Sequence, residues 1–229
     1  MINKSYKKGK AWIEKHRFKL LLAATIMVLV LPAMAVNDIL RLILFSISMS
    51  FLLIQSMIVA TTKIAKRTVF RYSIVVIMII IIWLEPIGIK IPIFDEFKLL
   101  LFAVFFVFVT FYLVKFVKKS INVDVNVIIT AINVYLLMGI ISGNLAFLLY
   151  NTLPDAYNFP SYITKPNFVN FNYYSFVTMS TVGYGDITPR LPQTQTLAYL
   201  IAVSGQLYVA IVMAFLIGKL LMHRQEDEK

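Results

Sequence analysis

The chain has 229 residues, of which 60% are hydrophobic and 14% are charged. Soluble globular domains are about 45–50% apolar and about 25% charged, so this composition indicates an integral membrane protein. The absence of cysteine excludes a disulfide framework, a thiolate metal site and a cysteine nucleophile. The net charge of +11 does not indicate nucleic-acid binding, because the basic residues flank apolar runs instead of covering a soluble domain.

The first 19 residues form a basic segment ahead of the first apolar run. Residues 6–19 hold Trp12, Ile13 and Phe18 among six basic residues. Two interpretations stay open for them: an interfacial helix on anionic lipid headgroups, or a solvated tail. The sequence at 33–35, Ala-Met-Ala, resembles a signal-peptide cleavage site. Retention of the first span is favoured over cleavage, since the basic segment is long for a signal peptide.

Six apolar runs predict six transmembrane helices, because about 20 residues of helix cross about 30 Å of hydrocarbon. The third run carries Arg71 and Glu85 close enough to its ends for their charges to reach the interface. The runs are 20–37, 42–62, 69–89, 97–117, 125–153 and one within 191–218.

The basic residues are distributed unevenly between alternate loops. With a cytoplasmic N-terminus, 17 of the 22 lysines and arginines fall in inner segments. This asymmetry fits the positive-inside rule for a protein of the plasma (inner) membrane with both termini in the cytoplasm. The outer basic residues are Arg41, Lys90, Lys98, Lys165 and Arg190.

A seventh uncharged run, residues 166–185, is long enough to cross the membrane but contains three asparagines, two serines, two threonines and two glycines. Backbone polar groups in such a segment are tolerated only inside protein or beside a water-filled cavity. We therefore expect a re-entrant segment with a short helix over residues 171–180. The partial negative charge at the C-terminus of that helix favours a cation.

The sequence TVGYG follows this helix at residues 181–185. Gly183 and Gly185 alternate along it, and glycine reaches positive φ at little steric cost, so successive carbonyls can face one axis. Four copies around that axis form rings of oxygens that replace the hydration shell of a cation. The motif TVGYGD in this context resembles the selectivity filter of tetrameric potassium channels, and the resemblance covers about residues 123–219.

The resemblance implies a homotetramer with K⁺ as the permeant ion and with no cofactor. It implies that K⁺ binds the backbone carbonyls of the first four filter residues and the hydroxyl of the first. The implied filter residues are Thr181, Val182, Gly183, Tyr184 and Gly185.

In this superfamily two neighbouring aromatic residues of the pore helix support the filter tyrosine. Tyr173 and Tyr174 occupy these positions, which implies similar support of Tyr184 with altered hydrogen bonding. Asp186 matches the acidic residue that follows the family's filter. Some members pair that acid with a pore-helix glutamate, but Val177 stands at the matching position, which puts any inactivation that needs the pair in doubt.

Two groups of small residues lie in the helices around this segment. Gly205, in the inner helix, is predicted to be a gating hinge, with close packing as the alternative. Residues 139–143, with a glycine at each end, form a small-residue face extended by Ala146. We expect this face to pack against the inner helix.

The first four spans resemble a voltage-sensor domain in number and order only. In voltage-gated channels the fourth span carries several arginines, but here no basic residue lies between Leu99 and Val114. The predicted organisation is a basic cytoplasmic segment at 1–19, a four-helix membrane domain at 20–120, a pore domain at 121–218 and a cytoplasmic tail at 219–229.

The sequence thus predicts an all-α membrane protein that conducts K⁺ passively without steep voltage gating. The alternatives are a weakly selective or constitutively open cation channel and a non-conducting membrane scaffold or effector. An active uptake subunit is disfavoured, because such transporters resemble four filter-like repeats in one chain and only one is found here. An enzyme is disfavoured because no span offers a paired base and nucleophile. Beyond K⁺ and membrane lipids, the sequence indicates neither the gating stimulus nor accessory subunits.

Overall fold

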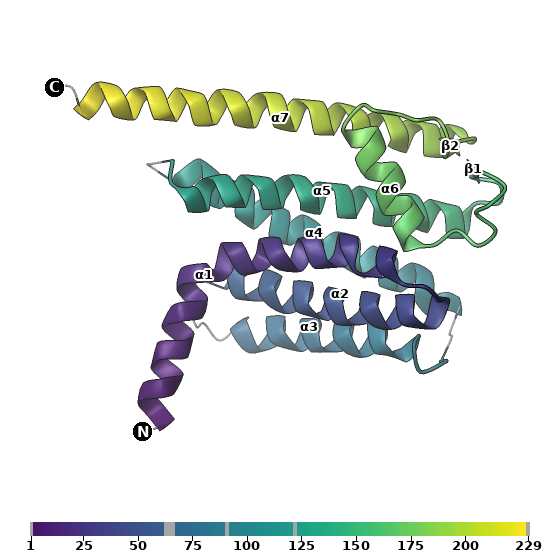
Figure 1. Cartoon of the computed structure of the whole chain (residues 1–229), viewed down its shortest axis with the longest axis horizontal. Helices are drawn as coiled ribbons and strands as arrows, with labels where there is room; N and C mark the ends of the chain where they lie inside the picture. Colours follow the sequence, from purple (N-terminus) through teal and green to yellow (C-terminus); the bar gives the residue numbers. More distant parts are fainter. Residues whose placement is uncertain (1, 62–66, 90–91, 121–122, 228–229) are drawn as a thin grey trace. The chain divides into compact units, whose positions relative to one another are not determined.

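The computed structural model describes residues 2–61, 67–89, 92–120 and 123–227, most of which are helical (Figure 1). The chain separates into two compact units, Met1–Ile89 and Lys90–Lys229. Each unit is described by itself.

The first unit is built from three long helices that lie side by side, with α2 contacting both α1 and α3 (Figure 1). The basic segment and the first span form one continuous helix, α1, which turns sharply part-way along its length. The elements are α1 (Ile2–Val30), the 3₁₀ turn η1 (Pro32–Met34), α2 (Asp38–Ala60) and α3 (Arg67–Leu84).

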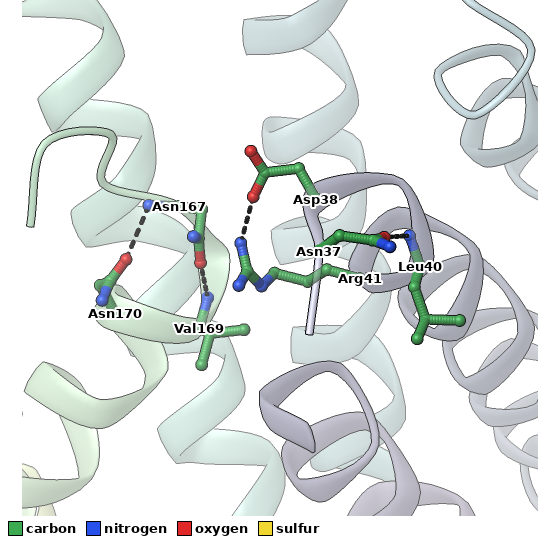
Figure 2. A network of polar contacts seen from close by, with 7 residues as sticks. All are labelled: Asn37, Asp38, Leu40, Arg41, Asn167, Val169 and Asn170. Carbon is green, nitrogen blue, oxygen red and sulfur yellow. Dashed lines mark hydrogen bonds and ion pairs between the residues drawn. The ribbon is translucent and has the colours of Figure 1, made fainter. Parts of the chain in front are cut away.

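The N-terminus of α2 is capped by Asn37, whose side-chain oxygen accepts a 2.7 Å hydrogen bond from the Leu40 amide (Figure 2). Asp38 follows in the first turn, where a negative charge complements the helix dipole, and it pairs with Arg41 at 2.5 Å. The predicted second span begins at residue 42, and this cap moves the start of the helix to Asp38.

The third predicted span, residues 69–89, is shorter in the structure because α3 ends at Leu84. The Gly88 amide donates to the Glu85 carbonyl and the Ile89 amide to the Leu84 carbonyl, both at 3.0 Å. Gly88 has φ of 89°, so these bonds form the closing turn in which a left-handed glycine satisfies the last helical carbonyls. The last five residues of the apolar run are therefore a helix cap.

The second unit contains the elements that position the candidate site. Helix α5 packs against both α4 and α6, and α7 contacts α5 and α6. The short strands pair antiparallel, with Tyr157 opposite Pro189 and Asn158 opposite Thr188. The elements are α4 (Pro92–Lys119), α5 (Val125–Thr152), β1 (Tyr157–Asn158), α6 (Phe168–Met179), β2 (Thr188–Pro189) and α7 (Pro192–Asp227).

Helix α4 packs on α5 through one apolar stripe at helical spacing. A buried hydrogen bond joins the two helices, from the Asn144 side-chain amide to the Leu99 carbonyl at 2.6 Å. The fourth span thus lies with the pore-like elements, whereas the sequence groups it with the three spans before it. The stripe comprises Leu99, Phe102, Ala103, Phe106, Val109, Leu113 and Val117.

Helix α6 starts three residues earlier than the predicted helix at 171–180, because Asn167 and Asn170 form a capping box. The Asn167 side chain accepts from the Val169 amide, and Asn170 accepts from the Asn167 amide (Figure 2). At 12 residues, α6 is about 18 Å long and too short to cross the hydrocarbon core.

Five helices of the described chain are long and apolar enough to cross a membrane, and Tyr72–Leu84 is a shorter apolar helix. The prediction of an all-α membrane protein is confirmed at this level, while the count of six spans stays a prediction. The five segments are Glu14–Met34, Asp38–Ala60, Glu96–Lys119, Val125–Thr152 and Pro192–Lys219.

Candidate functional site

Helix α6 lies between α5 and α7 and is held by close contacts at glycines (Figure 1). A Cβ atom at Gly139 would lie 2.3 Å from the Phe176 ring, and one at Gly143 would lie 2.7 Å from the Asn172 side chain. The Ser175 hydroxyl donates to the Gly139 carbonyl at 2.7 Å. The small-residue face of α5 therefore packs against α6, and the prediction that these glycines face the inner helix is wrong.

Gly205 makes the corresponding contact on α7. A Cβ atom at this position would lie 2.3 Å from Met179 Cγ and 2.4 Å from the Met179 carbonyl oxygen. Helix α7 runs unbroken through Gly205. The structure thus gives a packing reason for this glycine, at the point where α6 ends, and its role as a hinge stays a prediction.

A buried aromatic cluster anchors the other side of α6. Phe171 is fully buried and contacts the rings of Tyr150, Tyr157 and Phe159. The ring of Tyr174 packs edge-on against Tyr157 at 5.4 Å, in the same cluster. Tyr174 thus fixes α6 to the loop after α5, and support of Tyr184 by Tyr174 stays a prediction.

The backbone leaves α6 in an unusual conformation. Thr181, Gly183 and Gly185 have φ of 62°, 55° and 78°, so every second residue of the TVGYG segment is left-handed. Glycine is expected at two of these positions, but a β-branched residue at positive φ is uncommon. The sequence gives no signal for the conformation of Thr181, since residue type alone favours negative φ there.

The first three amide groups of this segment bond to carbonyls of α6. The Thr181 amide donates to the Thr178 carbonyl at 3.0 Å, and the Val182 and Gly183 amides both donate to the Val177 carbonyl, at 3.1 and 3.2 Å. Within the described part of the chain, the carbonyls of residues 181–185 accept no hydrogen bond. The first three amides of the segment are thus bonded to α6, and a row of backbone acceptors is left available.

Tyr173 joins α6 to the end of this segment. Its ring stacks on Tyr184, with the centroids 6.5 Å apart and the planes 8° from parallel. Its hydroxyl donates a 2.7 Å hydrogen bond to Asp186 Oδ2. This bond to a carboxylate raises the pKa of Tyr173 to about 12. One side chain of α6 thus contacts two residues that the sequence assigns to the site.

The segment is held at its far end by the loop after α5. The Arg190 amide donates to the Ala156 carbonyl at 3.0 Å, next to the pairing of β1 with β2. The Thr194 hydroxyl donates to the same carbonyl, also at 3.0 Å. Ala156 and Thr194 are absent from the predicted site, because a two-residue strand and a buried threonine carry little sequence signal.

Much of α7 is uncovered in a single chain. Only 11% of its apolar segment is buried, against 44% for α5. Tyr184 and Val182 are also exposed, at 71% and 54%. Among residues 192–219 of α7, the exposed large apolar residues are Tyr199, Leu200, Val203, Leu207, Val209, Ile211, Met213 and Ile217.

Residues 127–222 match a family model described as an ion channel. The match covers almost all of α5, all of α6, the TVGYG segment and most of α7, which are the elements that form this site. It supports ion channel activity and a pore-loop architecture, as the sequence predicts, and it favours transport over enzymatic activity. No curated protein and no solved structure matches the chain.

Proposed function

We propose that the chain is a subunit of a homotetrameric, potassium-selective channel in which residues 181–185 form the selectivity filter. The observation that carries the proposal is the backbone of this segment, where positive φ recurs at every second residue and the amides of residues 181–183 bond to α6. The carbonyls of Thr181–Tyr184 and the Thr181 hydroxyl are the proposed ligands of K⁺. No cofactor takes part.

The chemistry of this arrangement suits a dehydrated cation. Backbone carbonyls replace the oxygens of the hydration shell, and the C-terminus of α6 directs its partial negative charge toward the ion. One chain supplies a single row of carbonyls, so a closed ring of carbonyl oxygens around the ion requires four copies of the chain. The uncovered apolar surface of α7 supports this assembly, because oligomeric partners bury such faces.

The proposed channel opens without steep voltage dependence. Helix α4 carries Lys98 and Lys115 near its ends and no basic residue between Leu99 and Val114. A change in membrane potential therefore acts on few charges within this span. We place the protein in the plasma membrane with both termini in the cytoplasm, from the distribution of its basic residues.

Flux from liposomes tests the proposal with a matched pair of glycine variants. Gly183 and Gly88 both have positive φ, with no other atom within 4 Å of an added Cβ, so alanine strains both backbones alike. We expect wild type and Gly88→Ala to release K⁺ down its gradient when a protonophore balances the charge. Gly183→Ala is expected to abolish release while the tetramer still assembles.

The same assay separates the alternatives. Equal release of Na⁺ and K⁺ from wild type contradicts potassium selectivity and favours the weakly selective pore. Normal conduction by Gly183→Ala contradicts the role given to the backbone at residue 183. Absence of flux under every condition favours the non-conducting scaffold.

A further inference from the structure

We propose that the first half of α1 is an interfacial helix that binds the anionic lipid surface of the inner leaflet. The structure removes part of the ambiguity left by the sequence, because the basic segment is helical from Ile2 and continues without a break into the candidate span Glu14–Met34. The 12 residues before Glu14 extend at most about 18 Å, so this segment cannot leave the neighbourhood of the membrane.

The helical register separates two kinds of residue in this segment. At about 100° per residue, all the lysine and arginine positions between residues 2 and 19 fall within one arc of about 200°. The remaining arc contains the positions of Ile2, Tyr6, Trp12 and Ile13, together with a serine, a glycine and a histidine. Phe18 falls within the basic arc, and its side chain is buried in the protein. The basic positions are Lys4, Lys7, Lys8, Lys10, Lys15, Arg17 and Lys19.

Trp12 marks the apolar side of this helix. Its side chain is 55% exposed, and its ring lies 4.6 Å from the ring of His16, one turn further along. An exposed indole beside lysines is characteristic of the membrane interface, where the ring contacts lipid and the N–H contacts headgroups. Figure 1 shows that this part of α1 turns away from the direction of the part that follows it.

The charge and its position favour one partner, a layer of anionic lipid headgroups. Residues 2–19 carry seven basic residues and one acidic residue, Glu14, and four of the basic residues precede Glu14. Basic residues beside a span are attracted to the negative surface of the cytoplasmic leaflet. A helix with one basic and one more apolar side lies in the plane of the membrane interface. There the basic side contacts anionic headgroups and the other side contacts the acyl chains.

Trp12 fluorescence tests the proposal in the full-length chain and does not depend on conduction. Trp12 and Trp83 are the two tryptophans, so subtracting the spectrum of Trp12→Phe leaves the signal of Trp12. The protein is placed in nanodiscs of phosphatidylcholine alone or mixed with phosphatidylglycerol. We expect phosphatidylglycerol to shift Trp12 emission to shorter wavelength and to reduce its quenching by acrylamide.

Charge variants show whether the lysines cause this effect. Combined Lys7→Gln, Lys8→Gln and Lys15→Gln should lower the ratio of bound to unbound helix by about 100-fold, given the usual attraction per basic residue. A matched control changes Lys90, Lys98 and Lys165 to Gln, which removes the same charge elsewhere and should leave Trp12 unchanged. If the variant does not reconstitute, high salt on wild type should expose Trp12 instead, because salt screens the attraction.

Three results overturn the proposal. Strong quenching of Trp12 in both lipids indicates a solvated tail. Protection that does not depend on phosphatidylglycerol, or that persists in high salt, indicates a contact other than anionic lipid. An equal effect of the control variant indicates a response to net charge alone.

Discussion

Tyr173 and Asp186 lie 13 positions apart in the sequence and are joined by a 2.7 Å hydrogen bond from phenol to carboxylate. The same phenol ring stacks on Tyr184. A single side chain of α6 therefore contacts both the ring that lies between the two glycines and the acid that follows them. This contact uses no pore-helix glutamate, whose matching position is held by Val177.

We expect Tyr173→Phe to shorten the time for which the proposed filter conducts. Phenylalanine keeps the ring stack on Tyr184 and removes the hydrogen bond to Asp186. A hydrogen bond of this kind contributes about 0.5–1.5 kcal/mol, so the conducting lifetime should fall roughly twofold to tenfold in planar-bilayer recordings. Tyr72→Phe, the same change at an exposed tyrosine of α3, should have no effect. Equal conducting lifetimes of Tyr173→Phe and wild type would show that this hydrogen bond does not stabilise the conducting filter.

The same bond predicts a titration at high pH. A free tyrosine loses its proton near pH 10, whereas Asp186 raises the pKa of Tyr173 to about 12. The stabilising contribution is therefore fully present below pH 10 and is lost as the pH rises through about 12. Tyrosinate absorbance of wild type minus that of Tyr173→Phe should show one group ionising near pH 12, and ionisation near pH 10 contradicts the assignment.

Packing at the end of α6 predicts that Gly205→Ala destabilises the assembled protein. The new methyl group collides with the Met179 carbonyl, which is backbone and cannot move aside cheaply. Overpacking of this kind typically costs about 1–3 kcal/mol. Gly218→Ala is the matched control, because the site is open and alanine suits a helix. Thermal unfolding in detergent measures the cost. Altered gating of Gly205→Ala at wild-type stability would instead favour the hinge.

The buried bond between α4 and α5 predicts that Asn144→Ala weakens the contact of these helices. The change leaves the Leu99 carbonyl without its side-chain donor and removes packing, at a cost of about 1–3 kcal/mol. Asn151→Ala, at an exposed position of the same helix, should be neutral. Crosslinking between cysteines introduced into the exposed faces of α4 and α5 reports the contact. Identical crosslinking of both variants contradicts a role for Asn144.

The sequence carries the membrane class and the identity of the TVGYG segment because both depend on local residue type. Which neighbouring helix packs against a given helix face is harder to predict from sequence. Residues 139–143 clearly share a small-residue face, but spacing alone cannot distinguish α6 from α7 as the neighbour. The end of α3 could be predicted from Gly88, since a glycine just after the last helical turn is typical of a helix cap. Counting uncharged residues misses that signal.

Thr181 shows a different limit. Its left-handed backbone follows from the hydrogen bonds that draw residues 181–183 back onto α6, and residue propensity favours the opposite sign of φ. Tertiary context outweighs local preference at this position. The hydrogen bond from Tyr173 to Asp186 likewise could not be predicted from the sequence. The sequence places both residues near the filter segment but does not indicate that they pair.

The glycine contacts around α6 have a consequence for chimeric channels. Residues 139 and 143 of α5 and residue 205 of α7 each leave room for one particular side chain or carbonyl of α6. A foreign segment grafted between α5 and α7 would have to fit the spaces that Phe176, Asn172 and Met179 fill in this chain. Successful exchange with other pore modules should therefore need junctions outside this set of contacts, before Asp124 and after residue 205, so that the glycines and their partners are transferred together.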